Sequence, residues 1–508
     1  MRALLVQARS ERTYWSFDRS LPYVRKAATM PPLGLATLAA HLPASWELRL
    51  RDLNVAPLVD DELRWAEAVL VSGMLAQADS LNEVLRRARS LGRRTVAGGP
   101  GPTTAPELFE AADHVFRGEA EGRLDLLVRT LEGREPVPQR CLSPPGGARP
   151  DMALARVPRY DLLDLGRYAN QALQWSRGCP FRCEFCDIVE IFGRVPRLKA
   201  PAQVVAELDA LFALGARGAL FFVDDNFVGN RREAARLLPV LQTWQERHDF
   251  PFQLCTEASI DLAGQPELVA GMVAAGFEEV FLGIETPSRA ALRESGKSQN
   301  LRVDPARAVE ALTRAGLEVF AGFIVGFDAE EPDIFDRQIQ FISSLPIPRA
   351  MAGLLMALPG TRLWRRLQAE GRLRDQGSGD NFARPNFEPA MEERTLLTGY
   401  RRLLATLYTP DAYYDRCALA VEWLPPRPHT AVGSADGGLA TVARIVWGIG
   451  VVGPRRRQFW RLVRRALRRG PLALPRALAL AVVGESLIAY TREVVLPRLD
   501  RALAQPHA

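Results

Sequence analysis

Three cysteines lie close together at a spacing that could hold an iron–sulfur cluster. Cys179, Cys183 and Cys186 follow the pattern C-x3-C-x2-C. Their thiolates could hold three irons of a [4Fe–4S] cube. The fourth iron would stay open to the amino and carboxylate groups of S-adenosylmethionine (SAM), which would receive one electron. A zinc site would need a fourth Cys or His, and none follows at a useful spacing. The remaining alternative is three half-buried cysteines in a loop.

The segment around these cysteines alternates strand and helix patterns. Residues 165–357 therefore predict a partial (β/α) barrel, whose catalytic loops would follow the carboxyl ends of its strands. Strands are expected at Leu220–Val223, Phe252–Cys255, Glu279–Gly283, Glu318–Ile324 and Ala352–Met356, and helices at Pro201–Leu214, Arg231–His248 and Asp304–Ala315. Asp224, Asp225 and Asn226 follow the first strand, and Glu285 follows the third. They could bind SAM or the substrate; helix caps and solvated loop side chains are the alternatives.

The N-terminal part predicts an α/β domain with a parallel sheet, because residues 1–134 alternate short apolar strands with helical patterns. Strands are expected at Ala3–Val6, Glu47–Asp52, Ala68–Ser72 and Thr95–Ala97, and helices at Leu33–Leu42 and Ala76–Gly92. Two strands lead into Ser72-Gly73-Met74 and Gly98-Gly99. Those residues would lie at the carboxyl edge of the sheet, where doubly wound folds bind ligands.

Two further segments complete the predicted organisation. Residues 135–164, rich in Pro, Gly and Arg, predict a linker, and residues 358–508 predict a mainly helical C-terminal domain with a flexible loop at Asp375–Asp380. A length of 508 residues suits roughly two to four domains.

Composition indicates a globular protein of the reducing cytoplasm. Hydrophobic residues make up 47% of the chain, and the cysteines outside the cluster pattern, Cys141, Cys255 and Cys417, are too scattered for a disulfide framework. The first residues resemble a strand more than a signal peptide. No uninterrupted apolar run reaches the ~18–20 residues that span a bilayer. A soluble or peripheral protein is therefore expected.

The net charge of +6 is unevenly distributed. From Pro454 to Ala508, twelve Arg face Glu485, Glu493 and Asp500, so this tail carries +9 and the rest of the chain −3. Such a tail argues against a nucleic-acid-binding face on the catalytic body. Residues 454–469 predict a basic amphipathic helix that could lie on an anionic membrane; an ordinary surface helix packed on the barrel is the alternative.

The residues around the cysteines resemble the radical SAM superfamily, and those on both sides fit its cobalamin-binding subclass. Cys186–Lys199 and Phe222–Asn230 are similar to the corresponding segments of the hopanoid C-2 methylase branch. The resemblance implies that Glu257, which follows a predicted strand, reaches SAM or its ribose. It further implies that the backbone of Gly322-Phe-Ile324-Val-Gly326 packs against adenine.

The same resemblance makes the N-terminal domain a Rossmann-like cobalamin-binding domain. Residues 72–74, Gly98 and Gly99 would line the channel for the nucleotide tail, and Gly118 and Glu119 would lie near the corrin. The familiar D-x-H-x-x-G motif, whose His ligates cobalt, is absent; Asp52-Leu-Asn54 stands where it might fall. His41 lies in an apolar helical pattern and is expected to be a core residue. Cobalamin is therefore expected without a protein His ligand; a domain that has lost its cofactor is the alternative.

The resemblance implies a cobalamin-dependent C-methyltransferase that acts on an unactivated carbon of a hydrophobic, hopanoid-like or other lipid-like small molecule. A 5′-deoxyadenosyl radical from one SAM would take hydrogen from the substrate, which would then receive a methyl group from methylcobalamin. A reductase such as flavodoxin or ferredoxin would supply electrons. A cyclase or rearrangement enzyme without methyl transfer is the runner-up, and a non-catalytic sensor is a third alternative.

Overall fold

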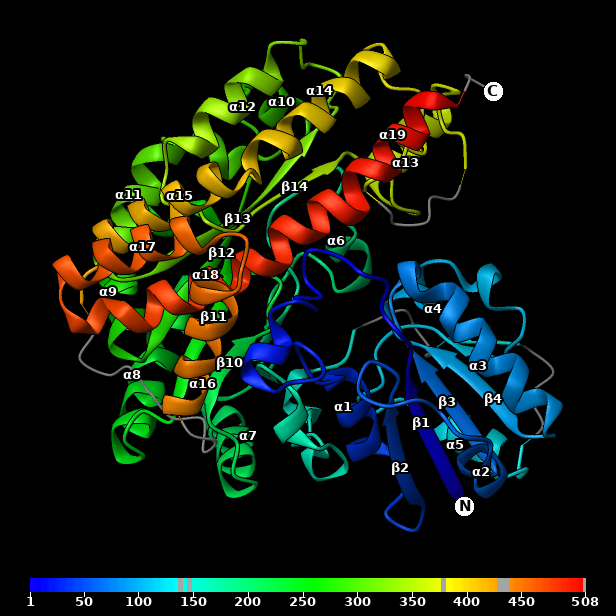
Figure 1. Ribbon diagram of the computed structural model, residues 1–508. Coiled ribbons are helices and arrows are strands. Elements are labelled where there is room, and N and C mark those ends of the chain that lie inside the picture. The colour runs from blue at the N-terminus through cyan, green and yellow to red at the C-terminus, as the bar shows by residue number, and fades with distance from the viewer. Residues whose placement is uncertain (136–139, 144–148, 376–380, 427–437, 506–508) are drawn as a thin grey trace. The chain divides into compact units, whose positions relative to one another are not determined.

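The computed structural model describes residues 1–135, 140–143, 149–375, 381–426 and 438–505. Most of the loop predicted at Asp375–Asp380 lies outside them. The chain forms two compact units (Figure 1). Unit 1 comprises residues 1–11, 26–179 and 187–216, and unit 2 comprises residues 12–25, 180–186 and 217–508. The four-part division of the chain into domains stays a prediction.

Unit 1 is built on a parallel sheet in the order β2-β1-β3-β4-β5-β6. Its strands are β1 Arg2–Gln7, β2 Glu47–Asp52, β3 Ala68–Ser72, β4 Arg94–Gly98, β5 His114–Phe116 and β6 Cys141–Leu142. The last strand falls inside the segment predicted to be a linker. Its helices are α1 Leu33–His41, α2 Asp60–Trp65, α3 Ala78–Ser90, α4 Pro100–Thr104, α5 Asp125–Leu131, α6 Ile188–Ile191 and α7 Pro201–Ala213.

Both faces of this sheet are buried, because side chains alternate along each strand. In β1, Leu4 and Val6 join one apolar cluster, and Ala3 and Leu5 join the other. The strand order changes direction between β1 and β3, which makes their carboxyl ends the topological switch point, where open α/β sheets bind ligands. The predicted Rossmann-like architecture is confirmed.

A short antiparallel hairpin in unit 1 carries the residues before the first cysteine of the motif. It pairs β8 Ser176–Arg177 with β9 Arg197–Leu198, and β7 Gln171–Leu173 precedes it. Lys199, which follows β9, is buried and pairs with Glu207 of α7, while Tyr160 donates a hydrogen bond to the same carboxylate. The hairpin is therefore anchored to α7.

Unit 2 contains parallel strands in the order β14-β13-β12-β11-β10, alternating with helices, as the predicted partial barrel requires. The strands are β10 Gly218–Phe222, β11 Phe252–Ala258, β12 Phe277–Glu285, β13 Glu318–Val325 and β14 Ala350–Leu354. The helices among them are α8 Arg231–Arg247, α9 Pro266–Ala274, α10 Arg289–Glu294, α11 Pro305–Ala315 and α12 Ile334–Ser343. One expectation was wrong: Glu257 lies inside β11, because that strand continues to Ala258.

The C-terminal region of unit 2 is helical, as predicted. Its helices are α13 Arg362–Ala369, α14 Glu393–Leu407, α15 Pro410–Trp423, α16 Gly438–Ile445, α17 Arg456–Arg469, α18 Leu474–Tyr490 and α19 Leu496–Ala504, with π-helical turns at Val446–Val451 and Thr491–Val495. The N-terminal segment 12–25 packs against them: the Tyr14 hydroxyl lies 2.7 Å from Thr491 Oγ1, and the Ser20 hydroxyl donates to the Val482 carbonyl.

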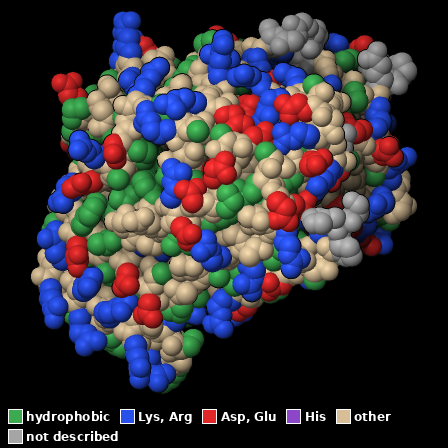
Figure 2. Space-filling view, turned by 90° about the horizontal axis from the view of Figure 1, so that it is seen from above, with side chains coloured by type: hydrophobic (Ala, Val, Ile, Leu, Met, Phe, Trp, Pro, Cys, Tyr) green, Lys and Arg blue, Asp and Glu red, His purple; other side chains and the backbone are tan. Residues whose placement is uncertain are grey.

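One described helical run, Pro471–Ala504, is long and apolar enough to cross a membrane by length and composition, which the sequence reading did not anticipate. Half of its most apolar stretch is buried inside the protein, as in a core helix. The run is therefore weak evidence for a membrane span. On the face of the molecule that Figure 2 shows, acidic and basic side chains are interspersed and apolar side chains form only scattered patches.

Candidate active site

The first cysteine of the motif is held by backbone contacts in unit 1. The Cys179 amide donates a hydrogen bond of 3.1 Å to the Gly193 carbonyl. Gly178 before it has a φ of +99°, and a Cβ there would lie 2.8 Å from the same carbonyl oxygen. Only glycine fits this left-handed position against backbone without strain. The chain therefore enters the cysteine loop along one defined path.

The three cysteines are partly exposed and are not joined in disulfides. Among the described residues, no group of three or more His, Cys, Asp or Glu side chains is placed as a ready metal site. The donor set nevertheless suits an iron–sulfur cluster, which is held by cysteine thiolates and leaves one iron open when only three bind. The ligand role of Cys179, Cys183 and Cys186 stays a prediction, and the three thiol side chains of the loop are of the type it requires.

Two buried side chains of unit 2 lie beside the other cysteines, and sequence reasoning missed both. The Gln299 amide lies 3.7 Å from the Cys183 sulfur as a donor. The Lys297 ammonium interacts electrostatically with Cys183 and Cys186. A cation and an N–H donor both favour an anionic sulfur cluster.

Glu285 ends β12 in an unusual backbone conformation. Its φ is +66°, which is rare for a residue other than glycine and tends to mark functional sites. Its carboxylate forms a 2.5 Å ion pair with Lys297, and both side chains are nearly buried. Burial alone would lower the pKa of Lys297, but the Glu285 carboxylate, together with the sulfurs of Cys183 and Cys186, outweighs burial and raises this pKa.

A compositional signal could have pointed to Lys297. Of the 65 basic Lys and Arg residues, only Lys26, Lys199 and Lys297 are lysines. Two of these three form buried ion pairs with glutamates. A chain that uses arginine nearly everywhere therefore keeps lysine at two positions where a compact charge is enclosed.

The carboxylates predicted to bind SAM lie close to this ion pair. Burial raises the pKa of Glu257 to about 8, helped by the neighbouring charges of Asp225 and Asp224, while Lys297 opposes the rise. A carboxyl group that is costly to ionise suits a site that receives a positively charged ligand group. Asn226 instead ties two strand ends together, since its amide nitrogen lies 3.3 Å from the Ser259 hydroxyl and its oxygen accepts from the Ser259 amide.

The segment predicted to pack against adenine forms the end of β13. Gly322 and Ile324 alternate with buried residues and are partly exposed on one face of the strand. Gly326 follows the strand, and its amide donates a 2.9 Å hydrogen bond to Glu330. Glu330 also accepts from Phe327 and from the Thr286 hydroxyl, so it holds the turn in place. Sequence reasoning did not identify Glu330.

In unit 1, the loops predicted to line the cobalamin channel pack tightly on each other. A Cβ on Gly99 would collide with the Ser72 hydroxyl, and one on Gly101 would lie 2.8 Å from the Met74 carbonyl carbon. Gly73 and Gly98 belong to the same pair of loops at the carboxyl edge of β3 and β4. Met74 is 64% exposed there. The loops fit a cofactor at the carboxyl edge of the sheet, although their glycines also serve this close packing.

Glu119, predicted to lie near the corrin, takes part in a buried ionic cluster of unit 1. Its two carboxylate oxygens accept from Arg177 at 2.8 Å and from Arg197 at 2.7 Å. Arg177 also donates to Glu121 at 2.6 Å. Gly118 precedes this cluster, and its amide donates to the Thr103 hydroxyl. The arrangement links the loop after β5 to the hairpin that leads into Cys179; a corrin contact of Glu119 stays a prediction.

Unit 1 contains two histidines, His41 and His114. His114 begins β5, at the amino end of that strand, and His41 ends α1, where it interacts electrostatically with Glu121 and Arg177. His41 is half-buried, and burial lowers its pKa. Asn54, at the expected motif position, ties the loop after β2 to the loop after β1: its amide nitrogen donates to Asp52 and to the Ala8 carbonyl, and its oxygen accepts from the Ser10 amide.

Family models match three parts of the chain. A B12 binding domain matches residues 24–128, the radical SAM superfamily matches residues 173–342, and a domain of unknown function matches residues 361–497. These matches cover strands β2 to β5 of unit 1, strands β10 to β13 of unit 2 and helices α13 to α18.

Two curated proteins are similar along nearly their whole length. An uncharacterized methyltransferase of Synechocystis sp. is 39% identical, covering 99% of this chain and 94% of its own. The hopanoid C-2 methylase of Rhodopseudomonas palustris is 36% identical, covering 97% and 94%. Among solved structures, the cobalamin-dependent SAM radical enzyme OxsB with aqua-cobalamin and SAM bound matches with a TM-score of 0.63 at 14% identity, covering 100% of this chain and 82% of its own. That likeness shows a shared fold.

Proposed function

Because the chain belongs to the cobalamin-binding radical SAM family of methyltransferases, we propose that it methylates an unactivated carbon of a hydrophobic, hopanoid-like or other lipid-like molecule. The similarity to the hopanoid C-2 methylase along both chains is the observation that carries this proposal. The family membership predicted from the residues around the cysteines is confirmed.

Aromatic side chains in unit 2 support an apolar substrate. Phe281 shares one face of β12 with Gly283, because residues two apart in a strand point the same way. The Glu285 carboxylate lies on that face as well, since a Cβ on Gly283 would collide with it. The Trp15 ring lies 5.6 Å from Phe281 and 6.1 Å from Phe320, and Trp15 is 42% exposed. Sites for small hydrophobic ligands are lined mainly by apolar and aromatic side chains with a few polar groups, as found at this end of β12.

When bound, the iron–sulfur cluster, SAM and cobalamin supply one-electron chemistry and a transferable methyl group. The protein would hold and orient them. Cys179, Cys183 and Cys186 would ligate iron. Glu257 and Asp225 would bind polar groups of SAM. Strand β13 would offer its partly exposed face to adenine. Such positioning can account for a large part of a rate enhancement.

The product test is anaerobic. The protein is reconstituted with iron, sulfide and cobalamin and given SAM, reductant and a hopanoid-containing lipid extract. We expect 5′-deoxyadenosine, cobalamin-dependent S-adenosylhomocysteine and a methyl label in the organic phase. Labelled products confined to the aqueous phase would overturn the lipid substrate. Deoxyadenosine without S-adenosylhomocysteine would contradict methyl transfer. Cys183→Ala is the control that should abolish SAM cleavage.

We further propose that cobalamin binds without a protein histidine below the cobalt. The position of His114 at the amino end of β5, and the hydrogen bonds that occupy the Asn54 side chain, support this. The electron paramagnetic resonance (EPR) spectrum of bound cob(II)alamin should lack nitrogen superhyperfine splitting from an axial ligand. A nitrogen-split spectrum that His41→Ala or His114→Ala removes would refute the proposal.

A peripheral contact with the cytoplasmic membrane surface is proposed for the outer face of α17. The apolar side chains Phe459, Leu462, Val463 and Ala466 are buried against the protein, so they are not the contact. Beside this buried side, about a quarter turn around the helix, Trp460 and Leu467 are exposed among arginines. Arg461 pairs with Asp415, and Arg465 with Glu422, on α15, which reduces the net charge. Aromatic and basic side chains together favour an anionic interface.

Vesicle co-sedimentation tests this contact. Anionic vesicles should retain the protein more than neutral ones, and replacing Trp460 and Leu467 by serine should reduce retention. Equal retention on both lipids, unchanged in the double variant, would refute it. A reductase such as flavodoxin or ferredoxin is the proposed electron donor; reduction of the cluster by neither would contradict that choice.

A further inference from the structure

Helix α13 begins the segment matched by the domain of unknown function, and it contacts the cysteine loop directly. The Leu363 amide donates a 2.9 Å hydrogen bond to the carbonyl of Glu184, the residue after Cys183. The Arg362 guanidinium donates to the Arg182 carbonyl at 3.3 Å. The Glu184 amide in turn donates to the Ser295 carbonyl. Backbone on both sides of Cys183 is therefore held from outside the loop.

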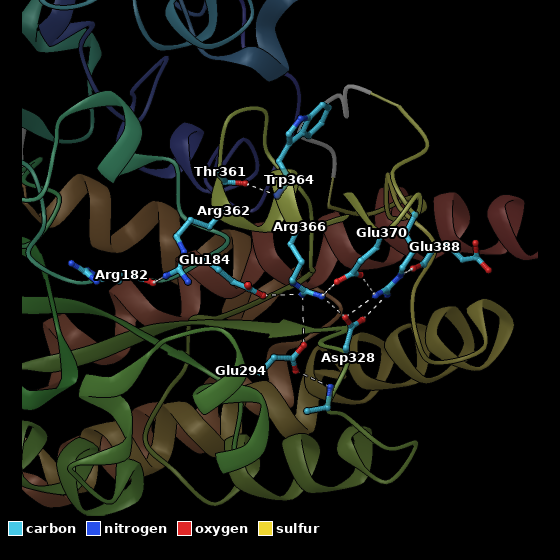
Figure 3. Close-up of polar contacts among 12 residues, drawn as sticks. Arg182, Glu184, Glu294, Asp328, Thr361, Arg362, Trp364, Arg366, Glu370 and Glu388 are labelled. Atoms are coloured by element: carbon cyan, nitrogen blue, oxygen red, sulfur yellow. Dashed lines mark hydrogen bonds and ion pairs between the residues drawn. The ribbon is translucent and has the colours of Figure 1, made fainter. Parts of the chain in front are cut away.

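Arg366, one turn further along α13, lies at the centre of an ionic cluster (Figure 3). Its Nη2 atom is 3.0 Å from the Glu184 carboxylate, and its Nη1 atom is 2.8 Å from Asp328. Glu294 of α10 lies 3.7 Å away. Arg372 makes a second pair with Asp328 at 2.6 Å. Burial alone would raise the pKa of Asp328, but the two arginines outweigh it and lower this pKa.

The acids that Arg366 joins come from two functional segments. Glu184 lies in the cysteine loop, while Asp328 follows the β13 turn that ends the predicted adenine segment. A planar guanidinium can hold two carboxylates at once, which a lysine ammonium does with less geometric definition. Arg366 therefore sets the distance between the loop and the end of β13.

Apolar contacts beneath the ionic cluster repeat this connection. Leu363 and Leu367 of α13 belong to one core with Phe327, and Phe185 of the cysteine loop and Ile324 of β13 pack against it. The Phe185 and Phe327 rings meet edge to face at 5.9 Å. Helix α13 thus contacts the loop through backbone, charge and packing.

We propose that α13 is a clamp for the cysteine loop and that Arg366 is a positioning residue for the iron–sulfur cluster. Its side chain holds Glu184, and with it Cys183 and Cys186, at a fixed position relative to the end of β13 that would bind SAM. The inference rests on the proposed ligand role of the cysteines. The first helix of the domain of unknown function would therefore hold the cysteine loop, and with it the iron–sulfur cluster, against the barrel.

The test compares cluster retention in full-length variants reconstituted anaerobically with iron and sulfide. Arg366→Met removes the bridge, Arg366→Lys keeps the charge, and Glu184→Gln removes only the loop carboxylate. Arg402→Met is the matched control, because Arg402 pairs with Asp336 on the surface, where both side chains are more than half exposed. Each protein is challenged with an iron chelator, and the loss of the visible sulfide-to-iron band is timed. EPR spectra of the reduced cluster with SAM are recorded in parallel.

We expect Arg366→Met and Glu184→Gln to lose the cluster about tenfold faster than wild type, equivalent to about 1.4 kcal/mol. Arg366→Lys should lie between, and Arg402→Met should match wild type. The SAM-bound EPR spectrum should change in the first two variants. Glu184→Gln keeps the helix attached through Asp328, so it tests the clamp even if Arg366→Met folds poorly. If Glu184→Gln and Arg366→Lys retain the cluster as long as wild type and give the same spectra, the clamp is overturned. If the wild-type protein itself takes up no cluster, the ligand assignment is overturned as well.

Discussion

The buried ionic cluster of unit 1 allows a quantitative prediction for Arg177→Met. Arg177 is 11% exposed and donates to Glu119 and Glu121, whose side chains are 5% and 2% exposed. Methionine has a similar length but no charge, so both carboxylates lose this partner. Glu119 retains Arg197 at 2.7 Å, whereas Glu121 loses its guanidinium. The substitution should therefore leave one buried carboxylate uncompensated.

The expected cost follows from the burial of the pair. Removing one partner of a buried ion pair costs about 3–5 kcal/mol, because an unpaired charge stays in a poor solvent. Arg197→Met should cost less, about 1–3 kcal/mol, since Arg177 still serves Glu119 and Arg197 is more exposed. Arg159→Met, a surface control in the same unit, should cost less than about 1 kcal/mol, because Arg159 and Asp161 are 43% and 50% exposed.

Urea unfolding of the three variants, prepared without the iron–sulfur cluster and followed by tryptophan fluorescence, measures these differences. The double variant Glu121→Gln, Arg177→Met should regain much of the lost stability, because the carboxylate left without a guanidinium becomes neutral while Glu119 keeps its pair with Arg197. Equal unfolding free energies for Arg177→Met and Arg159→Met would refute the argument that this charge is uncompensated. A double variant Glu121→Gln, Arg177→Met that is less stable than Arg177→Met alone would refute it as well.

Three further results are expected. The pKa of Glu257 is raised from 4.5 to about 8, so between these pH values the folded protein retains a proton that the unfolded chain releases, and the free energy of unfolding falls as the pH rises. The fall amounts to at most about 5 kcal/mol at pH 8 without ligands, and Glu257→Gln should remove it. Equal pH profiles of wild type and Glu257→Gln in urea unfolding would contradict this. Gln299→Leu should lower the reduction potential of the cluster in an EPR-monitored titration, because it removes a donor to the Cys183 sulfur, whereas an unchanged potential would exclude that bond. Trp15→Ala should raise KM for the hydrophobic substrate with little effect on SAM cleavage without substrate, and an unchanged KM would remove Trp15 from the site.

The fold was largely predictable because its signals are local. Short apolar strands alternating with helices predicted both parallel sheets, and most strand bounds differ from the structure by one or two residues. The error at β11 has a simple cause. Glu257 was expected to follow the strand because it is charged, yet the strand continues through it to Ala258, since every second residue of a barrel strand faces the interior and need not be apolar.

For the basic tail, the composition correctly predicted an amphipathic helix, but it could not show which part of the protein packs against that helix. The arginines and apolar residues of α17 predicted an amphipathic helix, and it is one. Whether its apolar side faces lipid or protein depends on what packs against it. In the structure α15 and α18 cover that side, so only the outer face with Trp460 and Leu467 remains available.

By itself, the sequence determined the chemistry and the family. A cysteine spacing, the segments around it and a glycine-containing strand end are contiguous in the chain, and contiguous residues keep their relation whatever the fold. Only the tertiary structure decided which distant residues support that chemistry. Lys297, Glu330 and Arg366 carry no motif, and their partners lie 12, 4 and up to 182 residues away. Such pairings arise from the order of strands and the packing of helices, because a charge becomes significant when folding encloses it beside an opposite one.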